Sequence, residues 1–154
     1  MQEKLETLFP GIKKNILLAP HTTFQIGGKA RYFFVARTTP LIIQAIKTAR
    51  SLHIPVFILA GGSNILVSDK GFAGLVVQIK NLKFKIKNSF VSAEAGVQMP
   101  TLVKEAGKRG LSGLEWAGGL PGSVGGAIRG NAGAFKGEIK DNILWVEALD
   151  AKGK

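Results

Sequence analysis

Two glycine-rich segments contain the residues whose types and spacing could do chemistry in this chain. Their members are Gly61, Gly62, Ser63, Asn64, Ile65 and Leu66 in the first glycine segment, and Pro121, Gly122, Ser123, Val124, Gly125 and Gly126 in the second. Glycines allow several backbone N–H groups to point into one concavity and to approach phosphate oxygens without a Cβ in the way. The side chains of Ser63 and Asn64 add further donors. Together the two segments predict a cradle for a diphosphate-bearing ligand.

Neither segment matches a standard phosphate-binding motif. The pattern Gly-x-Gly-x-x-Gly is absent, which disfavours a Rossmann dehydrogenase. Gly125 and Gly130 have the glycine spacing of a P-loop, but Asn131 and Ala132 follow where that motif requires Lys and Ser or Thr. A P-loop nucleotidase is therefore disfavoured as well.

A plain turn after a strand is the alternative explanation for the first glycine segment taken alone. The region 113–137 is harder to explain as turns, because its glycines far outnumber those that a turn needs. It also shows almost no helix or strand periodicity, so we expect a long ligand-binding loop there. Trp116, beside this loop, is expected to anchor it, with ligand contact as the alternative.

Other catalytic chemistry finds little support. His21 and His53 are the only histidines, and neither has an acidic or hydroxyl partner at a telling spacing. The chain has no cysteine, and its glutamates are scattered, so no metal site is predicted. Absence of cysteine is compatible with a reducing cytosol.

The first glycine segment lies at the end of an expected strand–helix–strand unit. Residues 30–36 predict a buried strand, Thr38 or Thr39 caps a helix that ends near His53, and 54–60 predict a second buried strand. The remaining expected elements are helices at 1–9 and 100–109 and strands at 75–79, 83–87, 90–94 and 143–149. We expect two lobes, 1–70 and 71–154, with the boundary between residues 68 and 74.

The formal charge of +11, from 21 Lys and Arg against 10 Asp and Glu, raises nucleic acid as a possible partner. The densest group, Lys80, Lys83, Lys85 and Lys87, includes a strict alternation with apolar residues, which indicates the solvated face of a strand. No apolar run approaches the roughly 20 residues that span a bilayer, and the N-terminus does not resemble a signal peptide. A soluble cytoplasmic protein with no nucleic-acid, membrane or metal partner is expected.

The sequence resembles the UDP-N-acetylenolpyruvoylglucosamine reductases, flavoenzymes of peptidoglycan precursor synthesis. The resemblance is in chain order and covers most of the sequence. It rests on Thr22-Thr23-Phe24-x-Ile26-Gly27-Gly28, Gly61-Gly62-Ser63-Asn64-Ile65-Leu66, Gly113-Leu114-Glu115, Pro121-Gly122-Ser123-Val124-Gly125-Gly126-Ala127 and Asn131-Ala132-Gly133-Ala134-Phe135. Each motif alone is weak, whereas their combination at these separations is specific.

The resemblance implies an α+β, FAD-binding fold of the vanillyl-alcohol-oxidase type, with two subdomains, FAD between them and a separate substrate domain. It implies that residues 61–66 and 122–126 hold the FAD diphosphate through backbone N–H groups, and that Asn131 and Ala132 lie along the flavin. NADPH would be the hydride donor, and a UDP-sugar enolpyruvate the substrate. The implied role is in cell wall biogenesis, and through it in cell shape and division.

One departure limits the resemblance. The family's Tyr-Arg-x-Ser segment, its proton-donating serine and its C-terminal glutamate all fall beyond Lys154, so the chain is expected to be the front portion of a longer protein, inactive by itself. Thr22 stands where many relatives have asparagine. Two alternatives stay open, namely the FAD domain of another oxidase or hydroxylase of this fold, and a nucleotide- or RNA-binding module without catalysis. The latter predicts salt-sensitive binding to polynucleotides and no flavin absorbance.

Overall fold

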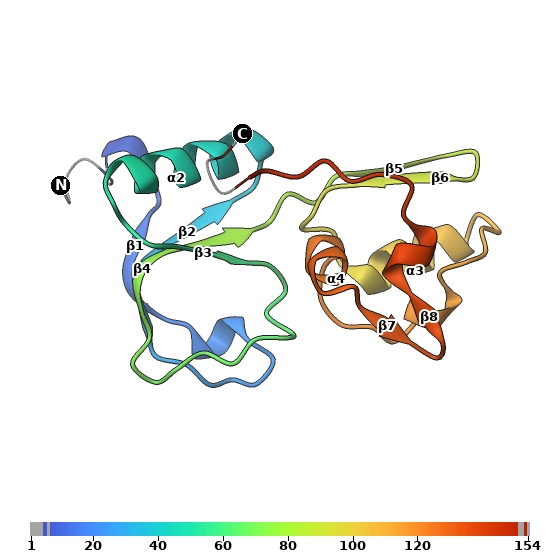
Figure 1. The fold of residues 1–154 in the computed structure, drawn as a ribbon, viewed down its shortest axis with the longest axis horizontal. Coiled ribbons are helices and arrows are strands. Elements are labelled where there is room, and N and C mark those ends of the chain that lie inside the picture. The colour runs from blue at the N-terminus through green and yellow to red at the C-terminus, as the bar shows by residue number, and fades with distance from the viewer. Residues whose placement is uncertain (1–4, 6, 151–152, 154) are drawn as a thin grey trace. The chain divides into compact units, whose positions relative to one another are not determined.

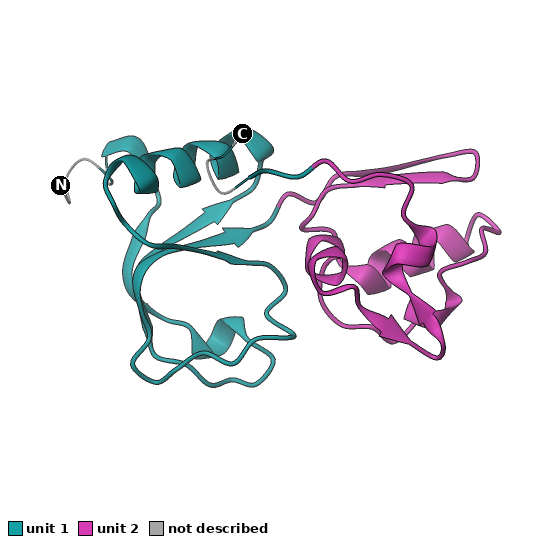
Figure 2. Cartoon of the chain, in the orientation of Figure 1, with its two compact units in different colours: residues 1–80, 148–154 teal, residues 81–147 magenta. Residues whose placement is uncertain are grey.

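The computed structural model of the chain describes residues 5, 7–150 and 153. These residues form two compact units, one comprising 1–80 and 148–154 and the other 81–147 (Figure 2). Each unit contains a hydrophobic core of its own. Among the described residues, no helix is long and apolar enough to cross a membrane.

Unit 1 is built on a four-stranded sheet in the order β1-β2-β4-β3 (Figure 1). Its strands are β1 (Lys13–Leu17), β2 (Lys29–Ala36), β3 (Val56–Leu59) and β4 (Phe72–Ile79). β1 runs antiparallel to β2, whereas β2 and β3 both run parallel to β4. Because β4 pairs on both sides within this sheet, the unit extends to Lys80, and the predicted boundary between residues 68 and 74 is too early.

Both faces of the sheet are covered. On one face, Tyr32 and Phe34 of β2 pack against α2 (Thr39–Ser51), as the strand's period of two requires. On the other face, Phe33 and Val76 form a smaller core with Leu18 and Leu59. Leu18 immediately precedes a short 3₁₀ helix, η1 (Ala19–His21), so this second core also anchors the chain that follows η1.

Unit 2 consists of short elements around one core. They are β5 (Phe84–Lys87), β6 (Phe90–Ala93), α3 (Met99–Gly107), η2 (Glu115–Ala117), α4 (Val124–Gly130), β7 (Gly133–Ala134), β8 (Gly137–Glu138) and η3 (Ile139–Asn142). β5 pairs with β6, and β7 with β8, each as an antiparallel hairpin. Met99, Leu102 and Ala106 of α3 are buried, at the spacing of one helix face.

The long irregular loop expected over 113–137 is not found. This region contains η2, α4 and most of the β7–β8 hairpin. Ser123 caps the N-terminus of α4, and its hydroxyl accepts a hydrogen bond from the N–H of Gly126. Glycines have low helix propensity and add no apolar side chains, so the sequence carries no visible helical period there.

Other differences concern pairing. β1 was not predicted, because it is an edge strand whose lysines and asparagine do not give the apolar pattern of a strand. β3 is also an edge strand, so Phe57 and Ile58 are 37% and 45% exposed where a buried strand was predicted. The strand predicted at 143–149 is wrong, because these residues pair with no strand among the described residues. The helix predicted at 1–9 lies partly outside the described residues.

The junction between the units supplies a test of unit 2. Asn81 is 4% exposed, and its Oδ1 accepts a hydrogen bond of 3.0 Å from the N–H of Gly96. Asn81→Ala would leave that buried N–H without its partner, so we expect a loss of about 1–3 kcal/mol in the free energy of unfolding of unit 2. Urea unfolding measures it, and Ser92→Ala, at an exposed position of β6, serves as the control. Equal stability of the two variants would contradict the proposed role of Asn81.

Candidate functional site: two glycine segments

The first glycine segment follows β3 directly and contains a row of unpaired donors. Within the described part of the chain, no acceptor takes the N–H groups of Gly61, Gly62, Asn64, Ile65 or Leu66. The side chains of Asn64 and Leu66 are exposed, whereas Ile65 packs on the smaller core of the sheet. A short stretch of backbone thus carries several N–H groups that an anion could accept.

Gly62 holds this segment against the chain that follows η1. It is buried and has a φ of +71°, and a Cβ at this position would overlap the carbonyl oxygen of His21. On its other side, Gly62 accepts a hydrogen bond of 3.0 Å from the N–H of Thr23. Only glycine fits both the positive φ and the close approach.

Gly27 and Gly28 form a second contact between the segment after η1 and the segment after β3. Gly28 donates its N–H to the carbonyl of Ser68 at 2.9 Å. A Cβ on Gly27 would lie 2.6 Å from the Cβ of Val67, and one on Gly28 would overlap the carbonyl oxygen of Asp69. The glycine pair noted in the sequence therefore serves contact between two loops, a role that the sequence analysis missed.

The contacts of His21 are those of a packed side chain and not those of a catalytic residue. Its ring packs on Phe33 in a tilted arrangement with centroids 4.5 Å apart, and its Nδ1 lies 3.5 Å from Nε2 of Gln78. Burial lowers the pKa of His21, and the positive charges of Lys80 and Lys13 lower it further. These surroundings favour the neutral form of the imidazole.

The second glycine segment is arranged differently, because most of its N–H groups are already paired. Val124 donates to the carbonyl of Val97 at 2.8 Å, and Gly125 donates to that of Ala95 at 2.9 Å. Gly126 donates to the hydroxyl of Ser123 at 3.4 Å. Donation to a diphosphate through these three N–H groups would require the existing bonds to break, so the N–H mechanism predicted from the sequence does not apply to them as the structure stands.

The glycine at 125 has a packing reason instead. A Cβ on Gly125 would lie 2.7 Å from the Cβ of Ala95, so the start of α4 can approach the chain before α3 only without a side chain there. Gly122 has a φ of +98°, and its carbonyl accepts a hydrogen bond from the N–H of Met99. Contact of this segment with FAD stays a prediction.

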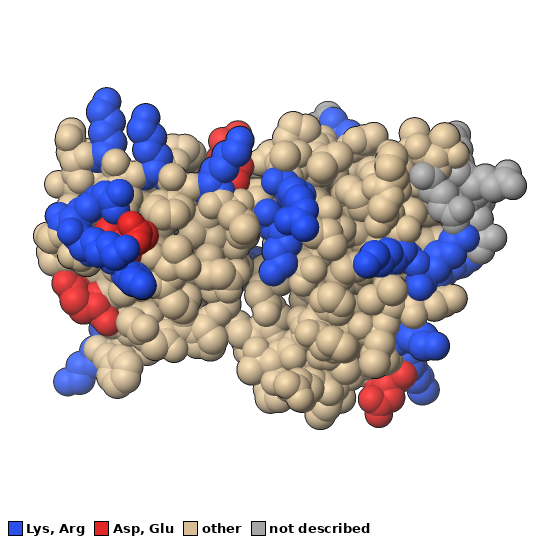
Figure 3. Space-filling model, turned by 180° about the vertical axis from the view of Figure 1, so that it is seen from behind, with Lys and Arg blue, Asp and Glu red and all other residues tan. Residues whose placement is uncertain are grey.

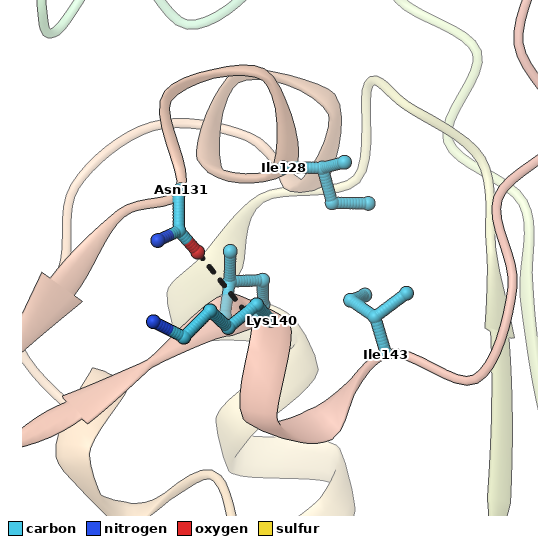
Figure 4. A pocket seen from close by; sticks show the side chains of 5 residues that line it. Ile128, Asn131, Lys140 and Ile143 are labelled. Atoms are coloured by element: carbon cyan, nitrogen blue, oxygen red, sulfur yellow. Dashed lines mark hydrogen bonds between the residues drawn. The ribbon is translucent and has the colours of Figure 1, made fainter.

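Asn131 closes the C-terminal end of α4 in the left-handed conformation, with a φ of 43°. Its Nδ2 donates to Glu138 at 2.8 Å, and its Oδ1 accepts from the N–H of Lys140 at 3.3 Å (Figure 4). Hydrogen bonds from Lys140 and Asn131 lower the pKa of Glu138. Ala132 adds to this connection between the end of α4 and residues 138–140, because its carbonyl accepts a hydrogen bond from the N–H of Ile139. That these two residues lie along a flavin stays a prediction.

A pocket of about 230 Å³ opens beside this connection. Its lining residues are Ile128, Asn131, Ile139, Lys140 and Ile143 (Figure 4). Trp116 of η2 anchors the β7–β8 hairpin and η3. Its indole N–H donates to Oδ1 of Asn142, and its ring leaves no room for a Cβ on Gly137. The anchoring role predicted for Trp116 is confirmed.

On the face drawn in Figure 3, Lys and Arg do not form one continuous track, because uncharged surface and some acidic residues separate them. Lys85 and Lys87 of β5 are exposed, and Phe84 and Ile86 are partly buried, which confirms the predicted alternation within this strand. Leu82, before the strand, is 51% exposed and does not follow it. Across residues 5, 7–150 and 153, no group of three His, Asp or Glu could hold a metal ion.

Comparison with known proteins identifies relatives for this arrangement. The family described as "FAD binding domain" matches residues 30–154. UDP-N-acetylenolpyruvoylglucosamine reductase of Caldicellulosiruptor bescii is 42% identical over 134 residues, which are 86% of this chain and 43% of the relative. The same-named protein of Clostridium novyi is 40% identical over 157 residues, 100% of this chain and 51% of the relative. The chain thus spans about half the length of the curated relatives it matches.

Solved structures agree with these relatives. The crystal structure of UDP-N-acetylenolpyruvylglucosamine reductase from Thermus caldophilus matches with a TM-score of 0.70 and 34% identity, over 84% of this chain and 46% of that one. An alkyldihydroxyacetonephosphate synthase matches with a TM-score of 0.63 over 91% of this chain and 31% of that one, and at 18% identity it shows the fold alone. The predicted α+β fold of the vanillyl-alcohol-oxidase type is confirmed.

The close approach at Gly62 supplies a matched pair of variants. Gly62→Ala would force a Cβ onto the carbonyl of His21 at a positive φ, so we expect the free energy of unfolding of unit 1 to fall by about 2 kcal/mol or more. At Gly119 a Cβ meets nothing within 4 Å, so Gly119→Ala is the control and should change stability little. Urea unfolding of both variants checks this, and a Gly62→Ala variant as stable as the control would contradict the packing described.

The environment of His21 predicts a pH dependence. Because its pKa is lowered in the fold, the unfolded chain takes up a proton below the ordinary value of 6.5 while folded His21 stays neutral. Stability should therefore fall as the pH is lowered through 6.5, and it should fall less in His21→Gln. Urea midpoints above and below that pH measure the difference. An identical pH dependence in both proteins would show that the His21 pKa is not lowered.

Proposed function

Because the chain belongs to the family of FAD-binding domains, we propose that it binds FAD and forms the FAD-binding part of a UDP-N-acetylenolpyruvoylglucosamine reductase. The observation that carries this proposal is that the N–H groups of Gly61, Gly62 and residues 64–66 have no acceptor within the described part of the chain, on a segment that glycine contacts hold in place. Backbone donors in such a row suit a diphosphate, whose oxygens can accept several hydrogen bonds at once.

The residues present fit this cofactor. Gly61, Gly62, Asn64, Ile65 and Leu66 would donate their N–H groups to the FAD diphosphate, and the exposed amide of Asn64 adds a side-chain donor. No Cβ shields the backbone at the two glycines. The formal charge of +11 favours approach of a dianionic group from solution.

The second glycine segment and the Asn131–Ala132 connection are proposed to contact other parts of FAD. Val124, Gly125 and Gly126 already donate their N–H groups within unit 2, so this segment would contribute shape rather than a row of donors. In the same way, the Asn131 amide is held by Glu138 and by the N–H of Lys140, so its position is fixed before any ligand arrives. We propose that the two units correspond to the two FAD-binding subdomains of this fold.

FAD, when bound, supplies hydride transfer, and this chain supplies binding and orientation. We propose NADPH as the hydride donor and a UDP-sugar enolpyruvate as the acceptor, in the cytoplasm and in service of peptidoglycan synthesis. Substrate contacts are assigned to a domain outside this chain. Support for this assignment comes from the names of the relatives, of which the chain spans about half.

A direct test is titration of the full chain, freed of flavin, with FAD and separately with riboflavin, followed by flavin fluorescence. FAD should bind at least about tenfold more tightly, because riboflavin lacks the diphosphate that accepts charge-assisted hydrogen bonds. The control variant Gly119→Ala should bind FAD as the unmodified chain does, since its site is open space. Failure to bind FAD, together with salt-sensitive binding to polynucleotides, would replace the proposal with the nucleic-acid alternative.

A further inference from the structure

We infer that Thr22 is a positioning residue for FAD, acting through the peptide of Gly62, an inference that rests on the proposed function. Thr22 lies between η1 and β2 and belongs to neither glycine segment. It is one of the buried polar residues of unit 1, with 6% of its surface exposed. A buried hydroxyl needs a partner, so its contacts show what it holds.

The hydroxyl of Thr22 closes a loop. Its Oγ1 lies 3.2 Å from the carbonyl oxygen of Ala19 and 3.3 Å from that of Ile26. Since a hydroxyl has one hydrogen to donate, it serves one of these carbonyls at a time, and both distances are at the long end of the hydrogen-bond range. The side chain thus lies between the two ends of the loop over 19–26 and ties Thr22 to one of them at a time.

The residues on either side of Thr22 are those that touch Gly62. The carbonyl of His21 lies against Gly62 Cα, and a Cβ there would also come within 3.1 Å of the Cα of Thr22. Thr23 donates its N–H to the carbonyl oxygen of Gly62 at 3.0 Å. Three consecutive residues thus lie against the backbone of Gly62.

This contact orients the backbone of the first glycine segment. In a trans peptide the carbonyl of one residue and the N–H of the next point in opposite directions, so the bond from Thr23 to the Gly62 carbonyl fixes the peptide plane between Gly62 and Ser63, from which the backbone of 64–66 continues. A second contact holds the chain two residues beyond the segment, where Gly28 donates to Ser68. Between these two contacts lie the N–H groups of Asn64, Ile65 and Leu66, which no acceptor takes among the described residues.

The consequence is preorganisation. Donors that are already aimed need not be ordered when the ligand binds, which preserves affinity. If the loop over 19–26 opens, Thr23 loses its register with Gly62, and the segment must be ordered at the expense of binding. The hydroxyl of Thr22 is therefore expected to affect FAD affinity without touching FAD.

The experiment compares Thr22→Val, which keeps the shape and removes the hydroxyl, with Thr22→Ser, which keeps the hydroxyl. Thr23→Val is the control, because the exposed Thr23 side chain forms no hydrogen bond among the described residues. We expect Thr22→Val to weaken FAD binding by roughly threefold to tenfold, as loss of one hydrogen bond would, and Thr22→Ser to restore it. Fluorescence titration of the full chain measures the affinities.

Amide hydrogen exchange without FAD provides the readout that a merely structural role would not give. In Thr22→Val the N–H of Thr23 should exchange faster, while the N–H groups of Val76 and Val77 in the core strand β4 keep their rates. Equal acceleration at all three would mean global destabilisation and would overturn the inference. Unchanged exchange at Thr23 would overturn it too, as would failure of Thr22→Ser to restore affinity. If the unmodified chain does not bind FAD, the proposed function fails, and the exchange data alone decide whether Thr22 holds the loop.

Discussion

The close contact between Gly62 and the chain that follows η1 is the constraint on which the first glycine segment depends. It leaves no space for a side chain and couples the backbone of Gly62 to His21 on one side and to Thr23 on the other. The coupling has its foundation in the sheet, since Leu18, just before η1, packs with Phe33 in the smaller core. Neighbouring segments thereby fix a loop in which the N–H groups of Gly61, Gly62 and residues 64–66 find no acceptor among the described residues.

The two glycine segments look alike in sequence, and they solve different physical problems. In the first, glycine permits a positive φ and leaves N–H groups available to a ligand. In the second, Gly125 lets α4 approach Ala95, and its N–H pairs with the carbonyl of Ala95 in the same contact. Glycine density alone therefore does not distinguish a ligand cradle from tight packing, and the hydrogen-bond partners do.

Much of the fold could be predicted because its elements carry their own periodicity. β2, α2 and α3 follow the alternation or helical spacing of their apolar residues. The predictions failed where pairing between distant segments determines the structure. β4 pairs with β2 and β3 and so belongs to unit 1. Residues 143–149 have strand-like alternation but no partner strand among the described residues. At the site, the glycines were predicted as a group, but the bracing role of Gly27, Gly28 and Thr22 was not, because it exists only between loops distant in sequence.

If the first glycine segment receives the diphosphate, its N–H groups should respond to FAD more than any others. Titration of the isotope-labelled chain with FAD, followed by the amide resonances, measures this response. The N–H resonances of Gly61, Gly62 and residues 64–66 should shift most, and those of 124–126, which already donate within unit 2, should shift less. Large shifts at 124–126 with none at 61–66 would contradict binding of the diphosphate by the first glycine segment.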